Sequence, residues 1–103
     1  MGTRATIQFS VDDDEQYFVY RGHDGFPENI MPDIEKTIAH IKGRWSEPEL
    51  SLLVTSFLGL MYEQNKGQRL PDYEITPCFH GDESYRYFVA WNRKTKSWDV
   101  SHS

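Results

Sequence analysis

Apolar and polar residues alternate near both ends of the chain, which is the pattern of strands that bury one face. Residues 3–9 alternate cleanly, and residues 17–21 are rich in aromatic side chains. Separated by a polar turn, these two segments predict an antiparallel hairpin. Further strands are predicted at 74–80, 85–91 and 97–100. Because both faces of 85–91 are apolar, we expect this strand inside the sheet.

Two helices are predicted between the strands. Isoleucines recur at spacings of four, four and three from Ile30 to Ile41, which makes one helical stripe. Pro32 fits the first turn of that helix, where a missing N–H costs little. A second helix is predicted from about Glu47 to Asn65, with Ser46 to Glu49 as its capping box. The element order ββααβββ then predicts an α+β fold: one antiparallel sheet of about five strands with two helices packed on one face.

The chain length of 103 residues favours a single domain, 1–103. No run of 18 apolar residues indicates a membrane span, and the N-terminus shows no signal-peptide pattern. The single cysteine, Cys78, cannot form an internal disulfide, which suits the cytoplasm of a host cell. Lying in a predicted strand, Cys78 is interpreted as a small buried hydrophobe.

Acidic side chains outnumber basic ones by 16 to 11, which gives a formal net charge of −5. This balance argues against direct nucleic-acid binding, which needs a basic surface. The acidic excess lies in the first two-thirds of the chain, so we expect an acidic face that meets a basic surface on a protein partner. Its predicted members are Asp12, Asp13, Asp14, Glu15, Asp24, Glu28, Asp33 and Glu35. The run Asp12 to Glu15 by itself favours a solvated hairpin loop, with divalent-cation binding or mimicry of a phosphate backbone as alternatives.

Arginines and tyrosines on the strands are a second candidate site. Together they can stack a base and bind a phosphate, and they are frequent in protein-binding hot spots. The predicted ligand-binding set is Arg4, Tyr20, Arg21, Arg86 and Tyr87. The alternative is a sheet whose solvent face carries tyrosines without a ligand.

Two His/Asp pairs in predicted loops are the third candidate. His23 with Asp24 and His80 with Asp82 would form a metal site if the loops met. A small metal-dependent hydrolase is therefore one alternative function. The chain has no nucleophile elbow, phosphate loop or zinc-type spacing, so we expect no enzyme activity, no cofactor and no metal.

Three segments in the N-terminal third of the chain resemble those of a known group of proteins. Thr3 to Thr6, Tyr20-Arg21 and Asp24 to Glu28 resemble segments of short, mostly uncharacterised phage and prophage proteins. In that group His and an aromatic residue precede the Asp-Gly turn, whereas this chain has Gly22-His23, so a ligand site built from those two side chains is not carried over. More remotely, the pattern is similar to Thoeris anti-defence sponge proteins, which sequester a cyclic ADP-ribose-type signal.

The resemblance implies a small phage- or mobile-element-type inhibitor of a bacterial defence system that acts by stoichiometric binding. In one mechanism the acidic face occludes a host defence protein, as anti-CRISPR proteins do. In the other, arginines and tyrosines sequester a nucleotide second messenger. A phage regulatory or structural protein unrelated to defence is a further alternative. No membrane partner is expected, and an edge strand with Trp98 and Val100 predicts a possible homodimer.

Overall fold

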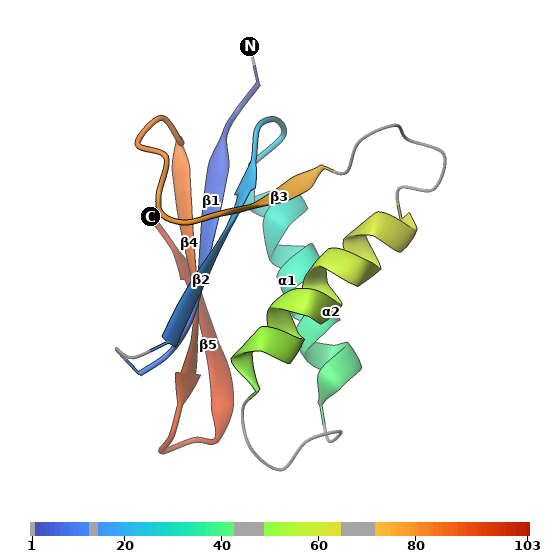
Figure 1. The fold of residues 1–103 in the computed structure, drawn as a ribbon, viewed down its shortest axis with the longest axis vertical. Helices are drawn as coiled ribbons and strands as arrows, with labels where there is room; N and C mark the ends of the chain where they lie inside the picture. Colours follow the sequence, from blue (N-terminus) through green and yellow to red (C-terminus); the bar gives the residue numbers. More distant parts are fainter. Residues whose placement is uncertain (1, 13–14, 43–48, 65–71) are drawn as a thin grey trace.

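The computed structural model describes residues 2–12, 15–42, 49–64 and 72–103 of the chain. Two helices lie on one side of a five-stranded sheet (Figure 1). The elements in chain order are β1 (Ala5–Val11), β2 (Glu15–Arg21), α1 (Pro27–Ile41), α2 (Leu50–Gln64), β3 (Tyr73–Thr76), β4 (Tyr85–Asn92) and β5 (Ser97–His102). This is the predicted α+β fold with its helices on one face. Across the described ranges, no helix has the length and apolarity that a membrane crossing requires.

The strand order is β3-β2-β1-β4-β5, so β4 lies inside the sheet as predicted. β1 pairs antiparallel with β2, with Ala5 opposite Arg21. β1 pairs parallel with β4, with Ala5 beside Tyr85. The sheet is therefore mixed, and the expectation of an antiparallel sheet was wrong for this one pairing. Alternation along a strand reveals which side chains are buried but does not reveal the direction of the neighbouring strand.

The parallel pairing depends on a crossover. Residues 77–84, which we name the crossover loop, leave β3 beside Phe18 and enter β4 beside Ala5. From β3 to β4 the loop spans three strand spacings, about 14 Å. Figure 1 shows this segment crossing the sheet on the side away from the helices. We name that side of the sheet the open face, and its residues include Thr6, Phe18, Tyr20 and Arg86.

The apolar core lies between the sheet and the helices. Ala5, Ile7 and Phe9 are buried there, as their alternation predicts. From the predicted isoleucine stripe, Ile30, Ile34 and Ile41 are buried and Ile38 is partly buried against the same cluster. The α2 side chains of this cluster are Leu50, Leu53, Val54, Phe57 and Met61.

Some local predictions were wrong. α1 begins at Pro27, so Pro27 takes the place at the helix start that the sequence indicated for Pro32, and Pro32 lies inside the helix. β3 ends at Thr76, and Cys78 is exposed in the crossover loop instead of buried in a strand. A proline at position 77 cannot donate a ladder hydrogen bond, which accounts for the early end. Most of the predicted capping box of the second helix, residues 46–48, lies outside the described residues.

Candidate functional site

The turn between β2 and α1 is architectural. The Gly25 N–H donates to the Thr3 carbonyl at 2.8 Å. A Cβ at Gly25 would lie 2.7 Å from the Ala5 Cβ, closer than van der Waals contact allows. The Tyr87 hydroxyl, fully buried, donates to the Gly25 carbonyl at 2.7 Å, and burial raises the pKa of Tyr87 to about 12. Tyr87 is therefore a core residue that no ligand reaches, in contrast to its predicted place in a ligand site.

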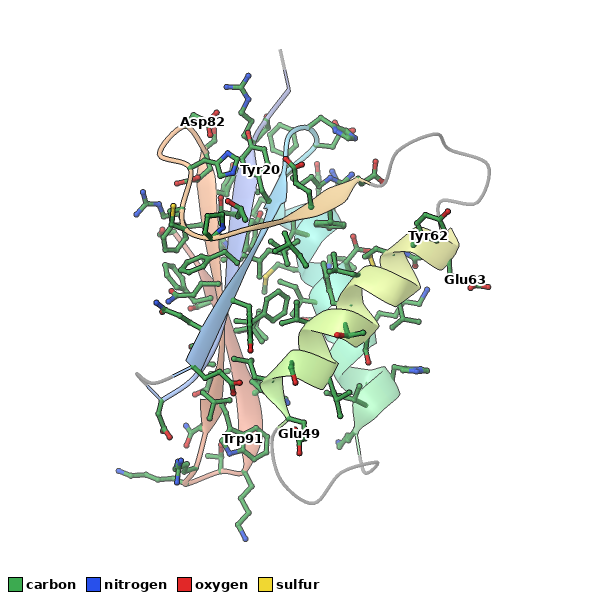
Figure 2. The ribbon with its side chains drawn as sticks, in the orientation of Figure 1. Tyr20, Glu49, Tyr62, Glu63, Asp82 and Trp91 are labelled. Carbon is green, nitrogen blue, oxygen red and sulfur yellow. The ribbon has the colours of Figure 1, made fainter. Side chains whose placement is uncertain are left out.

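At the same end of the molecule, the open face carries a cluster around Tyr20. Its ring stacks on the His80 imidazole, with centroids 3.6 Å apart and planes 12° from parallel. The Tyr20 hydroxyl donates to Asp82 at 3.4 Å, and Arg4 Nη1 lies 3.0 Å from the same carboxylate. Burial and the charge of Asp82 raise the pKa of Tyr20. Figure 2 shows Tyr20 and Asp82 together at this end of the sheet.

Next to this cluster, Glu83 anchors the crossover loop to the sheet. Its carboxylate, fully shielded from solvent, accepts a hydrogen bond from Thr6 Oγ1 at 2.8 Å and from Arg86 Nε at 3.0 Å. The backbone N–H groups of His80 and Gly81 donate to the same carboxylate, at 2.9 and 3.2 Å. Burial opposes the charged form, but these hydrogen bonds outweigh it and lower the pKa of Glu83. Glu83 is thus an ionised group that holds the loop in place.

Arg21 lies on the opposite side of the sheet. Its Nη1 donates to the Tyr73 hydroxyl at 3.1 Å and lies 3.8 Å from Asp33 of α1. The Tyr73 hydroxyl in turn donates to Asp33 at 2.7 Å, and burial together with Asp33 raises the pKa of Tyr73. This network joins β2, β3 and α1.

The five residues predicted to bind a ligand therefore lie on both faces of the sheet and do not form one site. Arg4, Tyr20 and Arg86 share the open face, whereas Arg21 and Tyr87 lie on the helix side. Arg4 and Arg86 are each already paired with a carboxylate of the crossover loop.

The predicted acidic face is also divided. Asp12 and Glu15 lie at the hairpin end of β1 and β2, because Val11 pairs with Glu15. Asp24 and Glu28 follow the other end of β2, about 20 Å away along seven residues of strand. Asp12 forms an ion pair with Arg93, and Asp13 and Asp14 lie outside the described residues.

One part of the acidic face stays together on α1. Asp24 precedes the helix, and Glu28 and Glu35 are seven residues, or about 10 Å, apart on one side of it. All three are exposed. Among the described residues, no cation lies within ion-pair distance of any of them.

The two His/Asp pairs do not form a metal site. His23 Nε2 lies 3.1 Å from Asp72, whereas His80 stacks on Tyr20 and lies 2.9 Å from the Thr76 hydroxyl. No group of three or more His, Cys, Asp or Glu side chains in the described ranges is arranged to hold a metal ion.

The pair of Thr76 and His80 is the nearest approach to a nucleophile beside a base. The Thr76 hydroxyl donates to the Cys78 carbonyl at 3.2 Å. Because a hydroxyl has one proton to donate, His80 Nε2 acts as the donor toward Thr76. This is the reverse of the arrangement that activates a nucleophile.

A shallow groove between α2 and β3 was not predicted from the sequence. Its volume is about 200 Å³, and it is lined by Leu58, Met61, Tyr62, Tyr73, Glu74 and Ile75. Tyr62 and Ile75 are the two most exposed large hydrophobic residues of the described chain, at 67% and 70%. Figure 2 shows Tyr62 at the C-terminal end of α2.

Sequence reasoning also missed Glu83 and the pairing of Tyr73 with Asp33. Glu83 is 77 residues from Thr6, and Tyr73 is 40 residues from Asp33. No periodicity connects positions so far apart, so only the fold brings these partners together.

Comparison with known proteins gave no match to this chain, whether with family models, curated proteins or solved structures.

Proposed function

We propose that this chain is a small inhibitor of a bacterial defence system, of the phage or mobile-element type, that binds stoichiometrically to a basic surface of a host defence protein. The observation that carries the proposal is a group of exposed carboxylates at α1 that form no ion pair with a described residue, whereas the described arginines are all paired. All four arginines of the described ranges, Arg4, Arg21, Arg86 and Arg93, are paired with carboxylates of the chain itself.

Three carboxylates at α1 are not paired in this way. Asp24, Glu28 and Glu35 have no described cation within ion-pair distance, since the neighbouring Lys36 bonds to Gln64, and they form an exposed acidic surface on and before α1. We name this set the α1 acidic surface. A basic partner surface would supply the missing charges and would accelerate encounter by electrostatic attraction.

Sequestration of a nucleotide is less well supported. The arginines of the open face, Arg4 and Arg86, already lie 3.0 Å from Asp82 and Glu83. Each carboxylate offsets the charge of its arginine and repels an incoming anion, and displacing the shielded Glu83 carboxylate would leave the His80 N–H without its acceptor. Binding of a cationic surface by the α1 acidic surface meets no such opposition.

The proposal is tested by expressing the chain in strains that each carry one defence system and challenging them with phage. Wild-type chain is expected to restore plaque formation in at least one strain and to co-purify with a component of that system. The purified complex is expected to weaken as salt rises, because the Debye length falls from about 10 Å at 0.1 M to about 3 Å at 1 M.

Charge reversals locate the surface. Glu35→Lys is expected to weaken the complex, whereas Glu15→Lys makes the same charge change at the far end of the sheet and should leave it unchanged. If Arg4→Ala and Arg86→Ala abolish protection while Glu35→Lys does not, the chain sequesters an anionic ligand and the acidic-surface proposal is wrong. Protection in none of the strains tested would argue against the inhibitor function.

A further inference from the structure

We infer that the outer edge of β3 receives an extended segment of the partner protein, one that alternates apolar and cationic side chains. This inference rests on the proposed binding function and specifies the chemistry of the partner. The edge lies beside the helix that carries the α1 acidic surface, because Asp33 of α1 accepts a hydrogen bond from Tyr73 at the start of β3.

The first observation is an open sheet edge. Within the part of the chain that the structure describes, β3 is the outermost strand on its side of the sheet and pairs with β2 alone. The outer edge of such a strand presents backbone N–H and C=O groups that an added strand can pair with. In this mode of recognition the backbone supplies affinity, and pockets for alternate side chains supply specificity.

The second observation is the groove beside that edge. Ile75 and Tyr62, both strongly exposed, border it together with Leu58. Its volume of about 200 Å³ is below the roughly 300–1,000 Å³ of small-molecule sites. The groove therefore suits one large apolar side chain better than a cofactor.

The third observation is the alternation of β3 itself. Tyr73 and Ile75 point to the helix side, where the groove lies, and Glu74 points to the open face opposite Tyr20. Glu74 is exposed and has no described cation within ion-pair distance. If a partner strand paired with β3, one of its side chains would lie beside Ile75 and the next side chain along that strand would lie beside Glu74. The side chain beside Ile75 must be apolar, and charge complementarity makes the side chain beside Glu74 Lys or Arg.

Two end-blocked seven-residue peptides test this, one alternating lysine and leucine and the other alternating glutamate and leucine. Binding to the full chain is followed by the backbone amide signals in NMR. The lysine peptide is expected to bind better, with shifts concentrated at residues 58–62 and 72–76. N-methylation of its backbone amides should remove binding, because an added strand depends on those donors.

Substitutions at the β3 edge test whether Glu74 and Ile75 set the peptide preference. Glu74→Lys is expected to reverse the preference toward the glutamate peptide by about fivefold, as an exposed charge pair allows. Ile75→Lys should weaken the lysine peptide by about tenfold or more. Both side chains are exposed, so the fold should survive. Glu15→Lys, with the same charge change at the hairpin end of β2, is the matched control and should leave the preference for the lysine peptide in place.

Three results would overturn the inference: no binding of the lysine peptide at millimolar concentration, shifts centred elsewhere, or an unchanged preference in Glu74→Lys. A dimer in sedimentation that Ile75→Lys dissociates would assign the edge to a second copy of the chain, which also contradicts it. If one of these results is obtained and wild-type chain still protects phage, the inference about the β3 edge is wrong but the proposed inhibitor function is not contradicted. Conversely, peptide binding without protection in any strain would remove only the inhibitor function.

Discussion

The two faces of the sheet are covered in different ways. On the helix side, Phe9 and Phe57 belong to a continuous apolar cluster with ring centroids 5.5 Å apart. On the open face, the crossover loop is the described segment that lies over the strands, and it is held by the Glu83 carboxylate and by rings such as Phe79 on Phe18. The helix side depends on burial of apolar area, which is insensitive to pH and salt. The open face depends on charges and directed hydrogen bonds, which are sensitive to both.

This difference separates architecture from surface chemistry. Tyr87 and Gly25 fix the helix side to the β2–α1 turn through a buried hydrogen bond. The charged groups of the open face are largely matched within the chain, as in the pair of Arg4 with Asp82. The exposed carboxylates of Glu28 and Glu35 on α1 and of Glu74 at the β3 edge have no described ion pair, and we place the binding surfaces there.

The largest expected effect is a truncation in the apolar cluster. Phe57→Ala removes a ring with no solvent exposure that contacts Phe9 and Tyr73, and should lower the free energy of unfolding by about 3–5 kcal/mol. Phe79→Ala removes a half-buried ring of the crossover loop and should cost about 1–2 kcal/mol. Denaturant unfolding at neutral pH measures both. Equal losses would contradict the distinction between the two faces.

A smaller loss of stability is expected from a substitution in the turn between β2 and α1. In Gly25→Ala the new Cβ would lie 2.7 Å from the Ala5 Cβ and 3.0 Å from the Thr3 carbonyl oxygen. The backbone must move, which also disturbs the Tyr87 hydrogen bond, so we expect a loss of about 1–3 kcal/mol. Gly59→Ala is the matched control, because nothing lies within 4 Å of a Cβ there. A loss at position 59 as large as that at 25 would show that the close approach is not the cause.

The acid dependence of stability is predicted to come partly from the open face. The pKa of Glu83 is lowered in the folded chain from a usual value of 4.5. Its stabilisation is therefore present at neutral pH and is lost as the pH falls through the folded pKa. Glu83→Gln, which cannot titrate, should cost about 1.5 kcal/mol at pH 7 and progressively less below about pH 4.

Unfolding by denaturant at pH 7 and pH 3 measures this difference. Thr6→Val, which removes one donor to Glu83 and keeps the carboxylate, should reduce the acid dependence only in part. If Glu83→Gln loses stability toward acid as steeply as wild type does, the Glu83 network does not contribute to the pH dependence.

Local patterns predicted the helix side well and the open face poorly. The positions of Ile7 and Ile34 follow from periods of 2 and 3.6 within single segments, so their burial could be read from the sequence. The parallel pairing of β1 with β4 and the hydrogen bond from Thr6 to Glu83 join segments more than seventy residues apart. Likewise, the acidic residues near Asp12 and near Glu28 look continuous in composition but lie at opposite ends of β2. Which charges neutralise one another is decided by tertiary structure.

The smallest expected change in stability comes from replacing an arginine by alanine, and the same replacement is compared on the open face and on the helix side. Arg4 and Asp82 are both 45% exposed, whereas the pair of Arg21 and Asp33 is 12% and 19% exposed. Arg4→Ala should cost only about 0.2–1 kcal/mol and should approach zero in 1 M salt, because solvent and ions screen exposed pairs. Arg21→Ala should cost more and keep most of its effect in salt, because it also leaves the buried Tyr73 hydroxyl without Arg21. Unfolding curves at 0.1 M and 1 M salt measure both variants. If the two losses fall equally with salt, the carboxylate of Asp33 is as well solvated as that of Asp82, and the buried character of the helix-side network is disproved.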